Sequence, residues 1–176
     1  MKGKIVLAAL ASVVMFASCD ELADLGIKVN LDRSADFTIY PSTVADTTYT
    51  ETTDTMRFDD IVGEVQASIP AFSKENLHGF LVDSVVFTLQ EPQSGNFNWA
   101  KSSSVTIRSA NHPAPVVVGE LADYPMDVMK VTVPGGGVDF ADRLKDDWFI
   151  FEVVTASDEV ILVEHKINGK FFMKVW

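Results

Sequence analysis

The sequence is poor in cysteine, in basic residues and in long hydrophobic runs. Its 176 residues contain one cysteine, so no intramolecular disulfide can form and a cysteine-rich zinc module is excluded. Lys and Arg number 14 against 25 Asp and Glu, which gives a formal charge of −11. Electrostatic binding to nucleic acid needs basic patches that such a composition lacks. The composition therefore predicts no nucleic-acid partner.

Familiar catalytic motifs are missing as well. The three histidines are His78, His112 and His165, and none has the spacing of a zinc site. No serine lies in a G-x-S-x-G motif. We therefore predict no metal, no cofactor and no enzymatic activity. A hydrolase that brings His112 or His165 beside Ser and Asp in space is the less favoured alternative, because such triads are not recognised by sequence position.

Two local clusters are better explained as ordinary surface than as ligand sites. Gly135–Gly137 is not followed by the Lys and Ser/Thr that complete a phosphate-binding loop, which predicts a flexible connection. Asp142, Asp146 and Asp147 lack the spacing of a calcium loop. We expect these three carboxylates to form a solvated acidic face.

The N-terminus has the features of an export signal. Lys2 and Lys4 precede an uncharged, apolar run at residues 5–16. A membrane-spanning helix needs about 20 apolar residues, so this run is too short to cross a bilayer. Its length is that of a signal-peptide core.

The residues that follow resemble the lipobox of bacterial lipoproteins. Phe16-Ala17-Ser18-Cys19 places small residues before the only cysteine of the chain. The resemblance implies a type II signal peptide at residues 1–18, cleavage before Cys19, and acylation of Cys19 with palmitate-type chains. Beyond this segment the chain is similar to small β-sandwich lipoproteins of Gram-negative envelopes.

Lipidation predicts attachment to a membrane. Two acyl chains already give stable anchoring, because each buried CH₂ contributes about 0.8 kcal/mol. Removal of residues 1–18 takes away two lysines and no acid, which leaves 12 basic and 25 acidic residues and a charge of −13. Anionic lipid headgroups repel such a domain. We expect a cell-envelope location at the outer membrane, and the sequence leaves its periplasmic or surface face open.

Short β-rich segments separated by turn residues make up the rest of the chain. Strands are expected at residues 81–89, 104–109, 128–133 and 148–155. A short helix is expected at 140–145, and either a strand or a weak helix at 60–69. About eight or nine strands without long helices favour an all-β, antiparallel two-sheet β-sandwich, either immunoglobulin-like or jelly-roll-like. A closed barrel is the second choice.

The expected domain organisation has three parts. The signal peptide occupies residues 1–18, a lipidated N-terminus and tether residues 19–35, and the β-sandwich residues 36–176. At the C-terminus, Asn168-Gly169 separates two β-rich runs, which predicts a hairpin turn.

A threonine-rich segment lies near the start of the sandwich. Seven of the fifteen residues 43–57 are Thr, which predicts a polar edge strand or a long solvated loop. Two Asp-Thr triplets in it resemble the O-glycosylation sites of some Gram-negative lineages. They make Thr47 and Thr55 candidate attachment sites.

Aromatic residues supply a candidate ligand site. Phe97 and Trp99 flank Asn98 in an extended segment, so both rings can share one face beside an amide. Exposed rings would stack on a sugar and Asn98 would bond its hydroxyls, whereas the alternative is burial of both rings in the core.

Taken together, these features predict a lipid-anchored envelope protein that acts through binding. The favoured function is an accessory or scaffolding subunit of an outer-membrane or surface assembly, with a protein partner. A surface glycan-binding module is the alternative, and an envelope hydrolase is the third.

Overall fold

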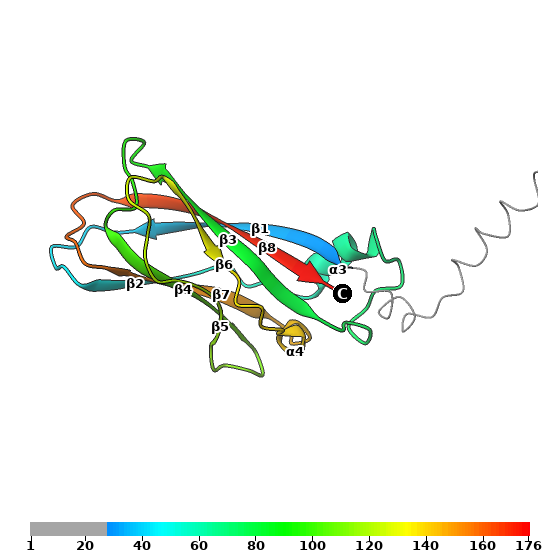
Figure 1. Ribbon diagram of the computed structural model, residues 1–176. Helices are drawn as coiled ribbons and strands as arrows, with labels where there is room; N and C mark the ends of the chain where they lie inside the picture. Colours follow the sequence, from blue (N-terminus) through cyan, green and yellow to red (C-terminus); the bar gives the residue numbers. More distant parts are fainter. Residues whose placement is uncertain (1–27) are drawn as a thin grey trace, which may run out of the picture.

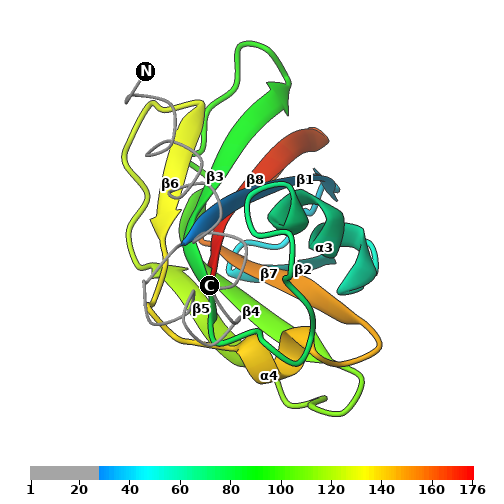
Figure 2. The ribbon, with the colours of Figure 1, turned by 90° about the vertical axis from the view of Figure 1, so that its right-hand side faces the viewer.

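Residues 28–176, which the computed structural model describes, form two four-stranded antiparallel sheets packed face to face (Figures 1 and 2). The expected antiparallel two-sheet β-sandwich is confirmed. The signal peptide, Cys19 and the first part of the tether lie outside the described residues. No helix in the described part of the chain is both long and apolar enough to span a membrane.

Eight strands and two short helices make up the fold. The strands are β1 Val29–Ile39, β2 Thr47–Thr52, β3 Phe80–Glu91, β4 Ala100–Ser109, β5 Val116–Leu121, β6 Lys130–Pro134, β7 Phe149–Ser157 and β8 His165–Val175. The helices are α3 Asp59–Gln66 and α4 Ala141–Leu144. The ambiguous segment at 60–69 is thus mostly helical, and the expected short helix near 140–145 is present.

The strand order distinguishes between the two expected kinds of sandwich. One sheet has the order β1-β8-β3-β6 and the other β2-β7-β4-β5. In chain order, β1 pairs with β8, β2 with β7, β3 with β6 and β4 with β5. This is the pairing of one long eight-stranded hairpin rolled into two layers, which is a jelly roll.

The expected hairpin at Asn168-Gly169 is wrong. Both residues lie inside β8, where Gly169 pairs with Ala35 of β1 and with Phe87 of β3. A Cβ on Gly169 would approach a Phe37 ring carbon to 2.5 Å and a Phe87 ring carbon to 3.1 Å. Glycine is present here because two aromatic rings occupy the space of a side chain, and not because the chain turns.

The first strand begins earlier than expected. β1 starts at Val29, so residues 29–35, which we assigned to the tether, belong to the sandwich. Residues 29–39 form one continuous strand, in which every residue from Val29 to Ile39 pairs with β8.

Aromatic rings fill the space between the sheets. Phe151 of β7 and Phe171 of β8 stack with ring centroids 4.8 Å apart. Both side chains are fully buried, as are Phe80 and Phe149. β7 and β8 alternate buried and half-buried residues, so each inner strand directs one face into this core.

The two long sides of the sandwich differ. On one side β5 and β6 meet through a Gly119–Gly135 bridge and a hydrogen bond from the Gly136 N–H to the Val118 carbonyl at 2.7 Å. A Cβ on Gly135 would overlap the Val82 carbonyl oxygen. Gly135 and Gly136 therefore form a close backbone junction between the sheets, at the start of the expected connection from β6 to α4.

The other long side lies between edge strands β1 and β2. Helix α3 covers the part of this side that is near the start of β1. Figure 2 shows α3 beside β1 and β2, on the side opposite β5 and β6. Arg33 of β1 ties the helix down, with an ion pair to Glu64 at 3.0 Å and a hydrogen bond to the Asp60 carbonyl at 3.0 Å. Ile61 and Val65 bury the inner face of the helix.

Two glycine substitutions test this account of the fold. Gly169→Ala introduces a methyl group against Phe37 and Phe87, and overpacking of this kind costs about 1–3 kcal/mol. Gly63→Ala in α3 meets nothing within 4 Å, and the better helix propensity of alanine should stabilise by up to about 1 kcal/mol. Urea denaturation of both variants measures the two effects. Equal stabilities for the two variants would contradict the packing role of Gly169.

Candidate functional site

The two ends of the sandwich carry different kinds of loop. We call the end where β1 begins at Val29 the proximal end, and the opposite end the distal end. Four loops form the distal end, at residues 40–46, 92–99, 122–129 and 158–164 (Figure 1). Helices α3 and α4 both lie toward the proximal end.

Exposed apolar side chains gather in the distal loops. Of nine large hydrophobic residues that are exposed among residues 28–176, seven lie there, and Leu162 is the most exposed at 78%. These seven are Tyr40, Val44, Met126, Met129, Val160, Leu162 and Val163. Exposed hydrophobic groups that cluster on loops are typical of interaction surfaces.

The distal loops also carry charge of one sign. They contain no Lys or Arg, and their six acidic residues are Asp46, Asp123, Asp127, Asp158, Glu159 and Glu164. The proximal connections, by contrast, include basic residues such as Arg57 and Arg143. The distal end is therefore both the most apolar and the most uniformly acidic end of the molecule.

Backbone pairing holds two of the distal loops against each other. Ser42 and Ile161 exchange N–H to carbonyl hydrogen bonds of 2.8 and 3.1 Å. Ile161 is buried, whereas Val160 and Leu162 on either side of it are exposed. The loop at 158–164 thus anchors one side chain in the core and presents its neighbours to solvent.

The other two distal loops are joined by Asn98 and Asp127. The Asn98 amide donates to the Asp127 carboxylate at 2.9 Å, and its oxygen accepts from the Asp127 N–H at 2.7 Å. The Phe97 N–H bonds the Val128 carbonyl at 2.9 Å. Asp127 has a positive φ of 58°, a conformation that aspartate tolerates better than most residues.

The structure contradicts the expected sugar-stacking platform. Phe97 is 1% exposed and Trp99 6%, so neither ring is available at the surface. Asn98 is engaged with Asp127 and not free to bond a ligand. The rings instead pack beneath the distal loops, with Phe97 against Tyr124 and Trp99 against His165. Phe97 and Trp99 are therefore buried by contacts with residues that are distant in the sequence.

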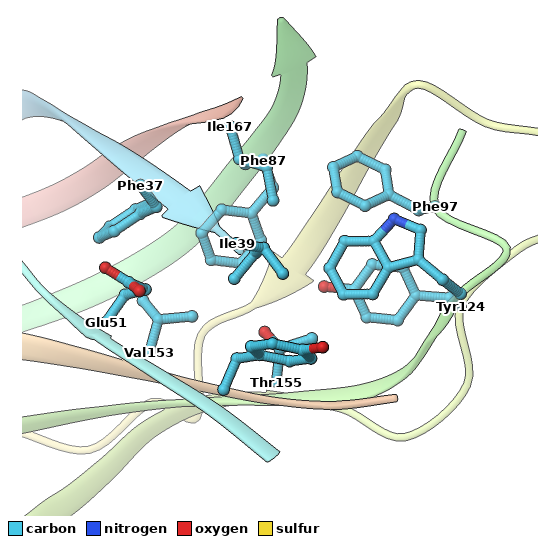
Figure 3. Close-up of a pocket in the computed structure, with 11 residues that line it drawn as sticks. Phe37, Ile39, Glu51, Phe87, Phe97, Tyr124, Val153, Thr155 and Ile167 are labelled. Atoms are coloured by element: carbon cyan, nitrogen blue, oxygen red, sulfur yellow. The ribbon is translucent and has the colours of Figure 1, made fainter. Parts of the chain in front are cut away.

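The rings of Phe97, Trp99 and Tyr124 line a narrow pocket between the two sheets (Figure 3). Its walls come from β1, β2, β3, β7, β8 and two distal loops. Figure 3 shows Glu51 on one side of the pocket and Phe97 and Tyr124 on the other. Burial raises the pKa of Glu51 above its usual value.

A hydroxyl network closes the inner wall of the pocket. The Ser103 hydroxyl lies 2.7 Å from the Tyr124 hydroxyl and 2.8 Å from the Thr155 hydroxyl. Burial raises the pKa of Tyr124 to about 12, although its hydrogen bond with Ser103 acts to lower it. The phenol therefore stays protonated, and these three hydroxyls are satisfied by one another.

A second polar cluster, at the proximal end, surrounds Asp146. Its carboxylate accepts from the Ser109 hydroxyl at 2.5 Å and from the Asn111 side chain and backbone at 2.8 and 3.0 Å, and it lies 3.0 Å from His112 Nδ1. Asp146 is 6% exposed. The expectation that it belongs to a solvated face is wrong, because the β4–β5 turn folds over it.

This cluster brings Ser, His and Asp together but does not connect them as a hydrolase does. In a catalytic triad the histidine lies between serine and aspartate, so that it removes the proton from the serine hydroxyl. Here Ser109 and His112 both bond the same carboxylate oxygen, and Ser109 is 0% exposed. Substrate has no access to that hydroxyl, so the cluster is best explained as a clasp between two proximal loops.

The remaining sequence-based site residues are placed as follows. Thr55 is exposed between β2 and α3, while Thr47 in β2 is half-buried and donates its hydroxyl to the Val44 carbonyl at 2.7 Å. Both stay predictions for O-glycosylation. His165 is buried with Nδ1 2.9 Å from the Val163 carbonyl. Within residues 28–176, no group of three or more His, Cys, Asp or Glu could hold a metal ion.

Comparison with known proteins leaves the function open. No protein-family model and no curated protein matches the chain. Among solved structures, the decameric BFDV capsid protein superposes with a TM-score of 0.35 at 8% identity, over 85% of this chain and 99% of that one. The Tobacco streak virus coat protein gives 0.36 at 19% identity, over 84% of each chain. Superpositions of this quality carry no argument about what this chain does.

The hydrogen bonds around Asp146 lead to a prediction about how the stability of the fold depends on pH. Burial acts to raise the pKa of Asp146, but the hydrogen bonds from Ser109, His112 and Asn111 outweigh it and hold the pKa well below its usual range. A lowered pKa stabilises the fold above the unfolded value near 4, and that stabilisation is lost as the pH falls toward the native value.

We therefore expect Asp146→Asn to lower the free energy of unfolding by about 2 kcal/mol at neutral pH. The difference in this free energy between the parent and the variant should shrink as the pH falls below about 4. Asp142→Asn, an exposed position on α4, is the matched control and should change little. Urea denaturation across that pH range measures both. A difference that is independent of pH would contradict a stabilised carboxylate.

Proposed function

We propose that this chain is a lipid-anchored protein of the bacterial cell envelope, held at the outer membrane through Cys19, and that it works by binding a protein partner with its distal loops. In this role it is an accessory or scaffolding subunit of a larger assembly. The observation that carries the proposal is the cluster of seven exposed apolar side chains at one end of an otherwise well-packed sandwich.

The position of the anchor supports this orientation. Cys19 precedes Lys28 by nine residues, and a fully extended chain of that length spans only about 30 Å. The chain enters the sandwich at Val29, on the proximal end. The lipid would therefore hold the proximal end toward the membrane and leave the distal loops facing away from it.

The charge of the distal loops indicates the chemistry of the partner. The distal loops that carry the exposed apolar groups contain six acidic residues and no basic residue. Anionic lipid headgroups would be repelled, so insertion of this end into a membrane is disfavoured. A complementary protein surface would offer an apolar centre bordered by Lys and Arg.

The anchor can be tested directly. Intact-mass analysis of the detergent-extracted native protein should give a chain that begins at Cys19 and carries three acyl groups. Cys19→Ala should abolish the modification and move the protein out of the membrane fraction, because acyl burial is the source of attachment. A native chain that begins at another residue, or membrane attachment that survives in Cys19→Ala, would contradict the proposal.

The binding surface can be tested by site-specific photocrosslinking in the native host. A photoreactive side chain at Leu162, in the distal loops, should give one discrete protein adduct. The same group at Val138, an exposed apolar position toward the proximal end, is the matched control and should give none. Adducts at both positions, or at neither, would count against a partner at the distal end.

A further inference from the structure

The proximal end carries a cleft that is far larger than the narrow pocket between the sheets. Its walls come from the connection before β3, the turn between β4 and β5, the start of β5, and α4 with the residues on either side of it. The centre of a water molecule can move within about 530 Å³ there, against about 20 Å³ in the narrow pocket. We call this space the proximal cleft. Its volume is in the range of about 300–1,000 Å³ that is typical of small-molecule sites.

Buried apolar side chains form the floor of the proximal cleft. Leu77, Phe140 and Ala141 all line it and are all buried. Val116 is half-buried and Val138 is exposed, and both line the cleft as well. An apolar group that enters the cleft therefore exchanges contact with water for contact with these side chains, which is favourable.

Two cations line the same cleft without a carboxylate partner. Within residues 28–176, neither Arg143 nor Lys145 makes an ion pair. One guanidinium nitrogen of Arg143 donates to the His112 carbonyl at 2.7 Å, which fixes the group beside the β4–β5 turn. A guanidinium has five N–H donors, so most of them remain available to a ligand. Available donors of this kind match the oxygens of a carboxylate.

An unpaired carboxylate lies on the same helix face as one of these cations. Asp142 lines the cleft, is exposed, and makes no ion pair in the described part of the chain. It lies in α4, and Lys145 follows three residues later at the end of that helix, so the two side chains are neighbours on its surface. Opposite charges are thus close together without pairing. This arrangement matches a ligand that carries both charges.

The charge balance of the lining disfavours a ligand with a net charge of either sign. The second carboxylate, Asp139, accepts the backbone N–H groups of Phe80 and Ala141 at Oδ1, at 3.0 and 2.9 Å. With both histidines counted as neutral, the two carboxylates cancel the two cations. An anion in the cleft is repelled by Asp142, and a simple cation is repelled by the basic side chains. A neutral molecule with one charge of each sign avoids both costs.

We propose that the proximal cleft binds a free α-amino acid with an apolar side chain. The ligand carboxylate accepts hydrogen bonds from Arg143 and Lys145, and its ammonium group donates to Asp142. Its side chain packs on Leu77 and Phe140. The cleft lies at the opposite end of the sandwich from the distal loops, so this site is independent of the surface proposed for a protein partner.

The three histidines report on this site in one NMR spectrum. His78 and His112 line the proximal cleft, whereas His165 is buried at the distal end of β8. His78→Gln and His112→Gln identify the ring-proton signals of the first two. Titration of the detergent-solubilised native protein with L-leucine should shift these two signals saturably and leave that of His165 in place. The absence of a saturable shift up to the solubility limit of leucine would overturn the proposal.

Three probes each lack one group of leucine. 4-Methylpentanoate lacks the ammonium group, 3-methylbutylamine lacks the carboxylate, and glycine lacks the apolar side chain. Each should bind at least about tenfold more weakly than leucine, because each loses either a charged hydrogen bond or the burial of apolar surface. Any of the three that binds as tightly as leucine would show that the missing group is not recognised, and the proposal would then be wrong.

Two variants at exposed positions assign the two charges. Lys145→Gln should weaken leucine about tenfold and leave 3-methylbutylamine unchanged, because that probe has no carboxylate. Asp142→Asn should weaken leucine to a similar extent but tighten 4-methylpentanoate, because it removes a charge that repels the anion.

Lys101→Gln is the matched control. Lys101 is also exposed and also makes no ion pair among the described residues, but it lies in β4 and does not line the cleft. It should leave the affinity for leucine unchanged. An equal effect of Lys145→Gln and Lys101→Gln would contradict a carboxylate contact in the cleft. Asp142→Asn that changes leucine and 4-methylpentanoate in the same direction would contradict the ammonium contact.

Discussion

The stacked rings of Phe151 and Phe171 join β7 and β8, one inner strand from each sheet, across the core of the sandwich. β7 lies between β2 and β4, and β8 lies between β1 and β3. Each inner strand sets the register of two neighbours, so the contact between these rings fixes how one sheet is placed on the other. The positions of the loops at both ends follow from that placement. Gly169 is part of the same arrangement, because it leaves room for the rings of Phe37 and Phe87 over β8.

The closure of one side of the sandwich leaves the other side free for a pocket. Backbone hydrogen bonds and a bridge join the sheets at Gly119, Gly135 and Gly136, and at Gly119 and Gly135 the neighbouring backbone is too close for a side chain. On the opposite side α3 covers the proximal part, held by Arg33. What remains is a narrow space between β1 and β2 in the distal half. It is lined by Tyr49 and Trp99, whose hydroxyl and indole N–H have no hydrogen-bond partner among residues 28–176.

The two ends use polar and apolar residues in opposite ways. At the proximal end the buried carboxylate of Asp146 is fully engaged by the turn that covers it, which stabilises the loops. At the distal end the loops are equally well held, by Ser42 with Ile161 and by Asn98 with Asp127, yet they expose apolar side chains. Exposed hydrophobic groups on loops that are held by such hydrogen bonds are typical of interaction surfaces. This contrast is the main reason why we propose binding at the distal end.

Local patterns predicted most of the strands, because alternation of apolar and polar residues reflects the pleat of a strand whatever its neighbours are. The polar segment around Thr50 was expected as an edge strand or a loop, and β2 is indeed an edge strand. The candidate site was less predictable. Phe97 and Trp99 had the right residue types for a surface platform. They are buried by residues far along the chain, Tyr124 against Phe97 and both Tyr49 and His165 against Trp99.

The sequence by itself determined the export-signal pattern, the acidic charge, the all-β class and most strand positions, since each depends on residues adjacent in the chain. The tertiary structure alone decided the jelly-roll order, the straight passage of β8 through Asn168 and Gly169, the enclosure of Asp146 and the gathering of apolar side chains at the distal end. Each of these depends on residues far apart in sequence, as when the side chain of Asn168 bonds Asp36, 132 positions earlier. An Asn-Gly pair favours a turn in an isolated segment. In the fold this pair is extended within β8, where the rings of Phe37 and Phe87 lie against Gly169.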